Sequence, residues 1–371
     1  MAYDNSTLTL TSVSTPDPFV TRFNDHFLLT FTTGNRVEIW SSRNLVDIER
    51  SSRHVIWTPP PGSDFSADLW APELHALRGR WYVYVAAAHP AHGNKSHRMY
   101  VLGGPPATAE PWQGPWAFLG RLRNLPETQW AIDGTAFELD DGALYFAYSG
   151  WPLTDPATHS DLVQQIFLVR LENPFTAAAD RPPVCISRPD CAWEITTDGN
   201  GDHGINEGPQ FLRAPDGSWQ GLVYSCAGSW TADYKMAVLR YIGGDPLDPR
   251  AWQKGVEPLA QAGGRGRGPF GPGHGSFLQL GGGEVIAIYH ATDNPTDGWG
   301  NRRARVQRVA FTEKGPYMGK SFGSLSTPGK GGLVNKVKQK LLHSKHEVGG
   351  EEGLRALLEG RGAAGRTHQE L

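Results

Sequence analysis

Three acidic residues stand at comparable points of a recurring sequence pattern: Asp17 in DPF, Asp133 in AIDGTAF and Glu207 in INEGPQ. Ionised carboxylates that are forced together repel one another, so at least one of them tends to keep a proton near neutral pH. A protonated and an ionised carboxyl group are the two partners of general acid–base catalysis. Glycosidic bonds are hydrolysed by such a pair on opposite sides of the anomeric carbon. A single Asp beside a turn usually has a structural role, but the recurrence favours a shared one.

The pattern that carries these residues occurs five times. Each copy has a leading residue beside Pro or Gly, an apolar run, a turn, and then an aromatic-rich run. The copies begin at Asp17, Ala71, Asp133, Glu207 and His274. Repeats of this length, built of strands and turns, are typical of the blades of a β-propeller. We therefore predict an all-β, five-bladed β-propeller in which the leading residues meet around the axis.

The elements that must hold these residues are short strands between turns. Further strands are predicted at residues 36–42, 98–104, 164–171 and 234–242, where apolar and polar residues alternate. Residues 1–13 and 303–311 also alternate. We expect one of these two segments to complete a blade begun by the other end of the chain, which removes the free edges of the ring.

The composition divides the chain into two parts. Residues 1–323 are predicted to form the propeller, which is the catalytic domain. Residues 324–371 are rich in Gly, Lys, Arg and Glu and have almost no aromatic residues, and we predict a polar, flexible C-terminal tail without a catalytic role. Within the tail, residues 333–345 could form a short amphipathic helix.

Charge and hydrophobicity limit the partners. The formal net charge of the 371 residues is −3, which indicates no basic face for nucleic acid. No run of about 18 apolar residues is present, so no membrane-spanning helix is predicted. The first residues lack the features of a secretory signal, and we expect a cytoplasmic location. The histidine-containing segment 89–97 is predicted to be an exposed loop.

The motifs resemble those of glycoside hydrolase family 43, whose members are five-bladed propellers that act on arabinose- and xylose-containing glycans. The resemblance covers about residues 14–323. It implies that Asp17 is the general base and Glu207 the general acid. It also implies that Asp133 raises the pKa of the acid and orients the sugar.

The same resemblance suggests binding residues. Trp70 in WAPEL would line the sugar pocket, and His274 in GPGHGSF would help to hold a metal ion at the axis, with calcium as the possible cofactor. Arg302 in GNRRARVQ would contact sugar hydroxyls and a catalytic carboxylate. The register leaves Arg303 and Arg305 as alternatives, and all three could equally be surface charges. No organic cofactor is expected.

The segments SGWP (149–152) and RYIGGDPLDP (240–249) resemble the α-L-arabinofuranosidase members most. The predicted function is an inverting, exo-acting α-L-arabinofuranosidase that releases arabinose from arabinan or arabinoxylan oligosaccharides. A β-xylosidase of the same family is the alternative. Related retaining fructan-processing propellers carry an Arg-Asp-Pro segment, which this chain lacks. A sugar-binding propeller without activity is the rival from another class, although binding alone requires neither an acid nor a base.

Overall fold

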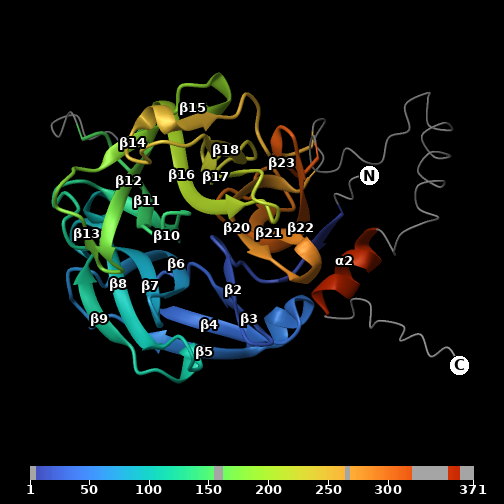
Figure 1. Cartoon of the computed structure of the whole chain (residues 1–371), viewed down its shortest axis with the longest axis horizontal. Coiled ribbons are helices and arrows are strands. Elements are labelled where there is room, and N and C mark those ends of the chain that lie inside the picture. Colours follow the sequence, from blue (N-terminus) through green and yellow to red (C-terminus); the bar gives the residue numbers. More distant parts are fainter. Residues whose placement is uncertain (1–5, 154–161, 264–267, 320–349, 360–371) are drawn as a thin grey trace, which may run out of the picture.

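The innermost strands of the sheets surround one axis of the molecule (Figure 1). The structure is a computed structural model that describes residues 6–153, 162–263, 268–319 and 350–359. Up to residue 319, the helical segments of these ranges are short 3₁₀ turns. The innermost strands are β2 (Phe19–Phe23), β6 (Ala67–Leu77), β10 (Ala131–Glu138), β16 (Gly201–Arg213) and β20 (Phe270–Gln279). The prediction of an all-β, five-bladed propeller is confirmed.

Each blade grows outward from its innermost strand through antiparallel pairing. The first two blades add β3 (His26–Thr30), β4 (Val37–Ser42) and β5 (Ser52–Trp57), and β7 (Arg80–Ala88), β8 (Arg98–Pro106) and β9 (Ala117–Arg121). The third blade adds β11 (Leu144–Gly150), β12 (Val163–Asn173), β13 (Thr176–Ala177) and β14 (Val184–Ser187). The strands predicted around residues 36–42, 98–104 and 164–171 are therefore β4, β8 and β12.

The fourth blade shares a sheet with the third. It contains β15 (Ile195–Asp198), β17 (Gln220–Cys226), β18 (Lys235–Tyr241) and β19 (Trp252–Lys254). At one end of the two blades, Val163 and Gln164 of β12 pair in parallel with Gly204 and Ile205 of β16. This bridge fixes the approach of β16, the strand that carries Glu207, to the cavity at the axis.

The fifth blade is closed by the N-terminal segment. It contains β21 (Val285–Thr292), β22 (Arg303–Thr312) and β23 (Gly315–Tyr317), and β1 (Thr7–Thr9) pairs antiparallel with β22 through Leu8 and Val306. The side chains of Leu8 and Leu10 are buried with those of blades 1 and 5. The predicted completion of a blade by the two ends of the propeller is thus correct, and it covers the edge of β22.

Aromatic side chains fill the space between blades. Trp81 and Trp40 are almost fully buried, as are Tyr84, Phe146 and Tyr289. Large rings bury the most apolar surface per side chain, and buried aromatic residues occur in every blade. The blades are therefore packed firmly enough to hold side chains at fixed positions around the axis.

The region predicted to be a polar tail contains one described element. Gly350–Leu358 form helix α2, whose Leu354 and Leu358 are buried among residues of blades 1 and 5. The helix predicted over 333–345 lies outside the described residues. No helix in the described part of the chain is long and apolar enough to cross a membrane.

Candidate active site

The innermost strands present their leading residues through a repeated backbone irregularity. The φ angles of Asp17, Ala71, Asp133 and His274 are 56°, 44°, 56° and 47°. L-residues rarely adopt this left-handed conformation, which costs about 1–3 kcal/mol and is concentrated at functional sites. The ladder registers of β6, β10 and β20 are interrupted at the same points. At each bulge, the leading side chain departs from the usual alternation of side chains between the two faces of the sheet.

Blade 4 differs from this pattern by one residue. Its left-handed position is Gly208, with φ of 54°, and its register shift lies between Glu207 and Gln210. Asp133 is therefore equivalent to Gly208, and Glu207 stands one residue before the bulge. The sequence-based alignment of Glu207 with the other leading residues was therefore wrong by one residue. In blade 4 a glycine adopts the left-handed conformation, so the acidic residue beside it does not have to.

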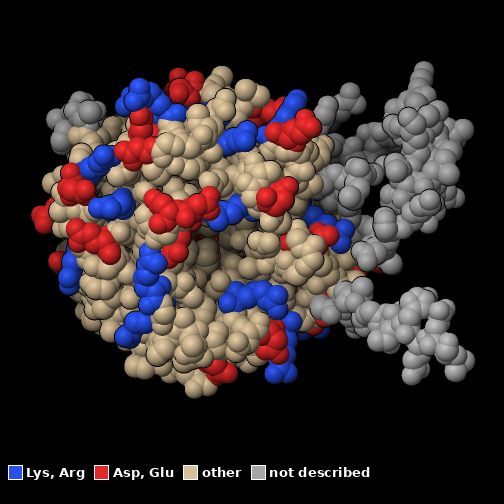
Figure 2. Space-filling view, in the orientation of Figure 1, with Lys and Arg blue, Asp and Glu red and all other residues tan. Residues whose placement is uncertain are grey.

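All six residues predicted to act at the site line one cavity of about 690 Å³. The hollow opens in the middle of the face seen in Figure 2. The six are Asp17, Trp70, Asp133, Glu207, His274 and Arg302. Residues that lie up to 285 positions apart in the sequence are thus brought together by the circular arrangement of the blades.

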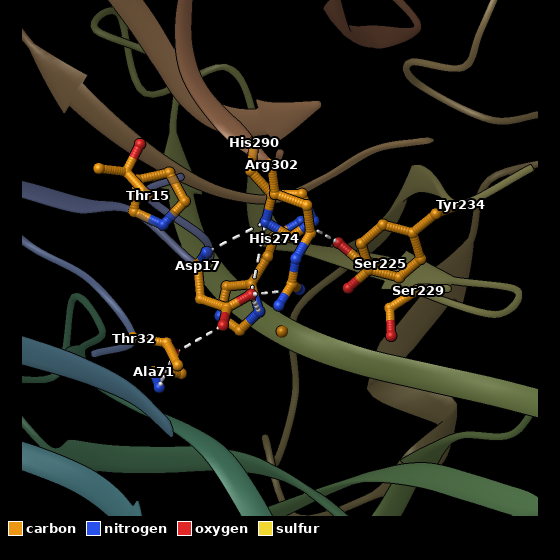
Figure 3. Close-up of polar contacts among 12 residues, drawn as sticks. Thr15, Asp17, Thr32, Ala71, Ser225, Ser229, Tyr234, His274, His290 and Arg302 are labelled. Atoms are coloured by element: carbon orange, nitrogen blue, oxygen red, sulfur yellow. Dashed lines mark hydrogen bonds and ion pairs between the residues drawn. The ribbon is translucent and has the colours of Figure 1, made fainter. Parts of the chain in front are cut away.

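The carboxylate of Asp17 lies among the Thr32 hydroxyl, the Arg302 guanidinium and two imidazole rings (Figure 3). Its Oδ2 accepts a hydrogen bond of 2.6 Å from the Thr32 hydroxyl. Its Oδ1 lies 3.5 Å from Nη1 of Arg302, 3.3 Å from Nδ1 of His274 and 3.4 Å from Nδ1 of His290. Burial alone would raise the pKa of Asp17, but Arg302 and, to a smaller extent, His274 hold this pKa well below its usual range. Asp17 is therefore ionised throughout the neutral range.

His290 also fixes the backbone of Asp17. Its Nδ1 accepts the backbone N–H of Asp17 at 3.0 Å. Burial and the nearby Arg302 lower the pKa of His290 to about 4, so its ring is neutral near pH 7. Because Nδ1 is an acceptor, the ring proton of this neutral histidine is on Nε2.

Glu207 has the opposite electrostatic environment. Burial raises its pKa to about 7, and the negative charge of Asp17 adds to this effect, while a hydrogen bond from Tyr234 opposes it. The phenol oxygen of Tyr234 lies 2.7 Å from Oε1 of Glu207. A carboxyl group with such a pKa is protonated in a large part of the molecules at neutral pH and can donate its proton.

Asp133 contacts His274 and the backbone that follows Glu207. Its Oδ2 accepts the backbone N–H of Gly208 at 3.1 Å and lies 3.8 Å from Nδ1 of His274. Burial raises the pKa of Asp133 well above its usual value, and the charges of Glu207 and Asp17 raise it further. The three carboxyl groups thus interact, and the site favours an ionised Asp17 with protonation shared by the other two.

Among the three arginines at the end of the fifth blade, Arg302 faces the cavity. Arg303 and Arg305 instead pair with Asp293, at 2.6 Å and 2.5 Å. The sequence left the choice among the three open, and the one that lines the cavity comes just before β22 begins.

Trp70 stacks on His97, with ring centroids 3.8 Å apart and an angle of 26°. His97 is fully buried and bonds to the carbonyl oxygen of Asp68. The expectation of an exposed loop over 89–97 was therefore wrong for its last residue, since Trp70 covers it. Asn94 of the same segment lines the cavity.

His274 was predicted to help hold a metal ion. Its Nδ1 is directed to the carboxylates of Asp17 and Asp133, so Nε2 is the nitrogen that a metal could reach. One imidazole is far from the six to eight oxygen ligands that calcium prefers, and water or substrate oxygens would have to supply the rest. Elsewhere, Asp190 and Glu194 lie at metal-ligand spacing with Cys191, but the Lys254 ammonium contacts both carboxylates.

Several lining or supporting residues were missed. Thr32 and Tyr234 have no motif that distinguishes them from ordinary strand residues. Glu73 of WAPEL is buried and bonds to His75 and Gln210, and its position in the motif could have indicated it. The remaining missed residues line the cavity wall: Trp130, Ile132, Gln164, Asp198, Asn200, His203, Ser229, Trp230 and Trp299.

Comparison with known proteins agrees with this geometry. The family model described as Glycosyl hydrolases family 43 matches residues 7–317. An extracellular exo-alpha-(1->5)-L-arabinofuranosidase of Streptomyces chartreusis is 31% identical over 287 residues, which cover 74% of this chain and 79% of that protein. Alpha-L-arabinofuranosidase 43 of Humicola insolens is 28% identical over 310 residues, which cover 81% of this chain and 60% of that protein.

A solved structure is similar over almost its full length. The alpha-L-arabinofuranosidase from Lactobacillus brevis superimposes with a TM-score of 0.72 at 27% identity, covering 85% of this chain and 97% of that one. The family match spans most of the chain, from the closing strand β1 to β23. The chain therefore belongs to glycosyl hydrolases family 43.

Proposed function

We propose that this protein is an inverting, exo-acting α-L-arabinofuranosidase that releases arabinose from arabinan- or arabinoxylan-type oligosaccharides. One observation carries the proposal. A carboxylate held in its ionised form, Asp17, shares a cavity with a carboxyl group whose pKa is raised to about 7, Glu207. This pair supplies a general base and a general acid at the same pH.

In the proposed reaction, Asp17 removes a proton from a water molecule whose oxygen attacks the anomeric carbon. Glu207 transfers its proton to the departing glycosidic oxygen as the bond breaks. The products are a free sugar of inverted configuration and a shortened oligosaccharide. Asp133 shares a proton with Glu207, raises the pKa of Glu207 in those molecules in which Asp133 is ionised, and accepts a hydrogen bond from a sugar hydroxyl. Arg302 keeps Asp17 ionised.

The names of the relatives favour arabinofuranosides over xylosides. The relatives from Streptomyces chartreusis and Humicola insolens and the structure from Lactobacillus brevis are all described as arabinofuranosidases. β-Xylosidase activity on xylose-containing oligosaccharides remains the alternative within the family. The buried acid and base count against a propeller that only binds sugar.

A panel of nitrophenyl glycosides tests the proposal. Turnover of the α-L-arabinofuranoside, with little or none of the β-D-xyloside or of sucrose, is the expected result. Proton NMR of the first product should show the inverted anomer. Preference for the xyloside would replace arabinose by xylose as the substrate, and initial release of the retained anomer would exclude Asp17 as a base acting through water.

Calcium and location also remain proposals. We infer that a calcium ion, if one is held, sits on the Nε2 side of His274 with water oxygens as further ligands. A chelator should then lower the melting temperature of the protein. An unchanged melting temperature would contradict a bound calcium ion at this site. We also propose a cytoplasmic location, which a measurement of arabinofuranosidase activity in fractionated cells would test. Nucleic acid and membranes are not proposed as partners.

A further inference from the structure

We propose that Tyr234 is a positioning residue that orients Glu207 and determines how readily Glu207 gives up its proton. This inference rests on the proposed role of Glu207 as the acid. Tyr234 lies just before β18 and is 1% exposed. Its phenol oxygen lies 2.7 Å from Oε1 of Glu207.

The direction of this hydrogen bond follows from chemistry. A phenol has one proton to donate, and burial together with the neighbouring charges of Glu207 and Asp133 raises the pKa of Tyr234 well above its usual value. Tyr234 therefore keeps its proton across the working range of pH. The bond is made to the acid itself and directs one oxygen of Glu207 away from the substrate, which leaves the other oxygen to carry the catalytic proton.

Two neighbouring residues hold the ring of Tyr234 in place. It stacks on His290 with an interplanar angle of 9° and a centroid distance of 5.6 Å. Gly273 lies against the edge of the ring, and a Cβ at that position would collide with it. His290 is the residue that accepts the backbone N–H of Asp17. One aromatic pair thus supports both the acid and the base. Figure 3 shows Tyr234, His290 and Asp17 in this arrangement.

A hydrogen bond donated to a carboxylate stabilises its ionised form and lowers its pKa. Tyr234 therefore opposes the effects of burial and of Asp17 on Glu207. Without it, Glu207 would hold its proton too firmly to release it to the leaving oxygen. The titratable or charged groups that face Glu207 from the surrounding elements are Asp17, Asp133, Tyr234, Cys226 and Arg302.

The test is Tyr234→Phe, which keeps the ring on His290 and beside Gly273 but removes the hydroxyl. The basic limb of the kcat/KM–pH profile reports the proton on the acid. Loss of the hydrogen bond should move this limb to higher pH by about one unit. The ratio of variant to wild-type activity should consequently rise by up to about tenfold between low and high pH.

Tyr224→Phe is the matched control. Tyr224 is also buried in blade 4 and donates to a buried carboxylate, Oε1 of Glu194, at 2.8 Å. Its substitution should lower the melting temperature and leave the basic limb in place. A general loss of packing in Tyr234→Phe would likewise lower activity at every pH without moving the limb, and this result would overturn the inference.

Glu207→Gln separates this inference from the proposed function. Its residual activity should lack the wild-type basic limb. If the limb is lost in Glu207→Gln but unmoved in Tyr234→Phe, the acid is correctly assigned and the role of Tyr234 is refuted. If the limb persists in Glu207→Gln, the assignment of the acid fails and the inference fails with it.

Discussion

At the scale of single residues, the site separates two chemically similar groups by their surroundings. Burial is the largest single influence on the pKa of both groups, but at Asp17 it is outweighed by Arg302 and His274, whereas at Glu207 it prevails. At Asp17, neighbouring groups offset the free-energy cost of burying a charge. At Glu207 this cost is not offset, so it favours the protonated form. This difference, and not the identity of the acids, assigns their roles.

Asp17→Asn should abolish most of the turnover, because an amide cannot take a proton from water. The expected loss is about 10²–10⁴-fold in kcat, with a circular dichroism spectrum like that of the wild type. Asp293→Asn is a suitable control, since Asp293 pairs with Arg303 and Arg305. A variant of Asp17 that kept most of its activity would contradict its role as the base.

Glu207→Gln should affect substrates according to their leaving groups. An arabino-oligosaccharide has a poor leaving group and needs the proton, whereas a nitrophenolate departs without it. We therefore expect kcat to fall far more for the oligosaccharide than for the nitrophenyl glycoside. Equal losses on both substrates would contradict the assignment of Glu207 as the acid.

At the scale of elements, loops of blades 4 and 5 build the side of the cavity next to the acid. Trp299 is 62% exposed, packs edge-on against Trp230 and donates from Nε1 to the Ser229 hydroxyl at 3.1 Å. Trp230 and Ser229 come from the same blade as Glu207. Because an acid protonates the leaving oxygen, the departing part of the oligosaccharide is expected on this side.

Trp299→Ala should therefore raise KM for an arabino-oligosaccharide severalfold, since stacking on an aromatic ring contributes about 0.5–1.5 kcal/mol. The KM of the nitrophenyl glycoside should change less, because it has no further sugar to bind. Ile242→Ala, another exposed apolar residue outside the cavity lining, serves as the control. An equal rise in KM for both substrates would show that Trp299 does not bind the departing part of the oligosaccharide.

At the scale of the whole molecule, the ring depends on segments that meet from opposite ends of the chain. Strand β1 completes blade 5, and helix α2 packs beside it on the outside of blades 1 and 5. Figure 1 shows α2 at the rim, next to the junction of the first and last blades. The helix thus covers the point at which the ring is closed.

Leu354→Ala should destabilise this junction. Leu354 is fully buried, and a buried Leu→Ala substitution costs about 2–5 kcal/mol. Urea unfolding should show a loss near the lower end of this range, since α2 lies at the periphery. Glu352→Ala on the exposed face should change stability by less than about 0.5 kcal/mol. Equal stability of the two variants would show that α2 does not contribute to the fold.

Much of the strand pattern followed from the sequence. Alternation and turn residues predicted β4, β8, β12 and β18, since strand periodicity is a local property. The glycine at the strained position of blade 4 could not be anticipated, because the repeat was aligned by its acidic residues. Tyr234 and Thr32 were missed for a related reason: their hydroxyls matter only through contacts with Glu207 and Asp17.

The sequence by itself determined the five-fold repeat and the three acidic residues at or beside its leading positions, because both belong to motifs that are continuous along the chain. Only the tertiary structure decided which carboxyl group is ionised, which arginine faces the sugar and which aromatic residues support them. Protonation depends on distance, burial and opposing charge between blades, and these quantities exist only once the ring has closed.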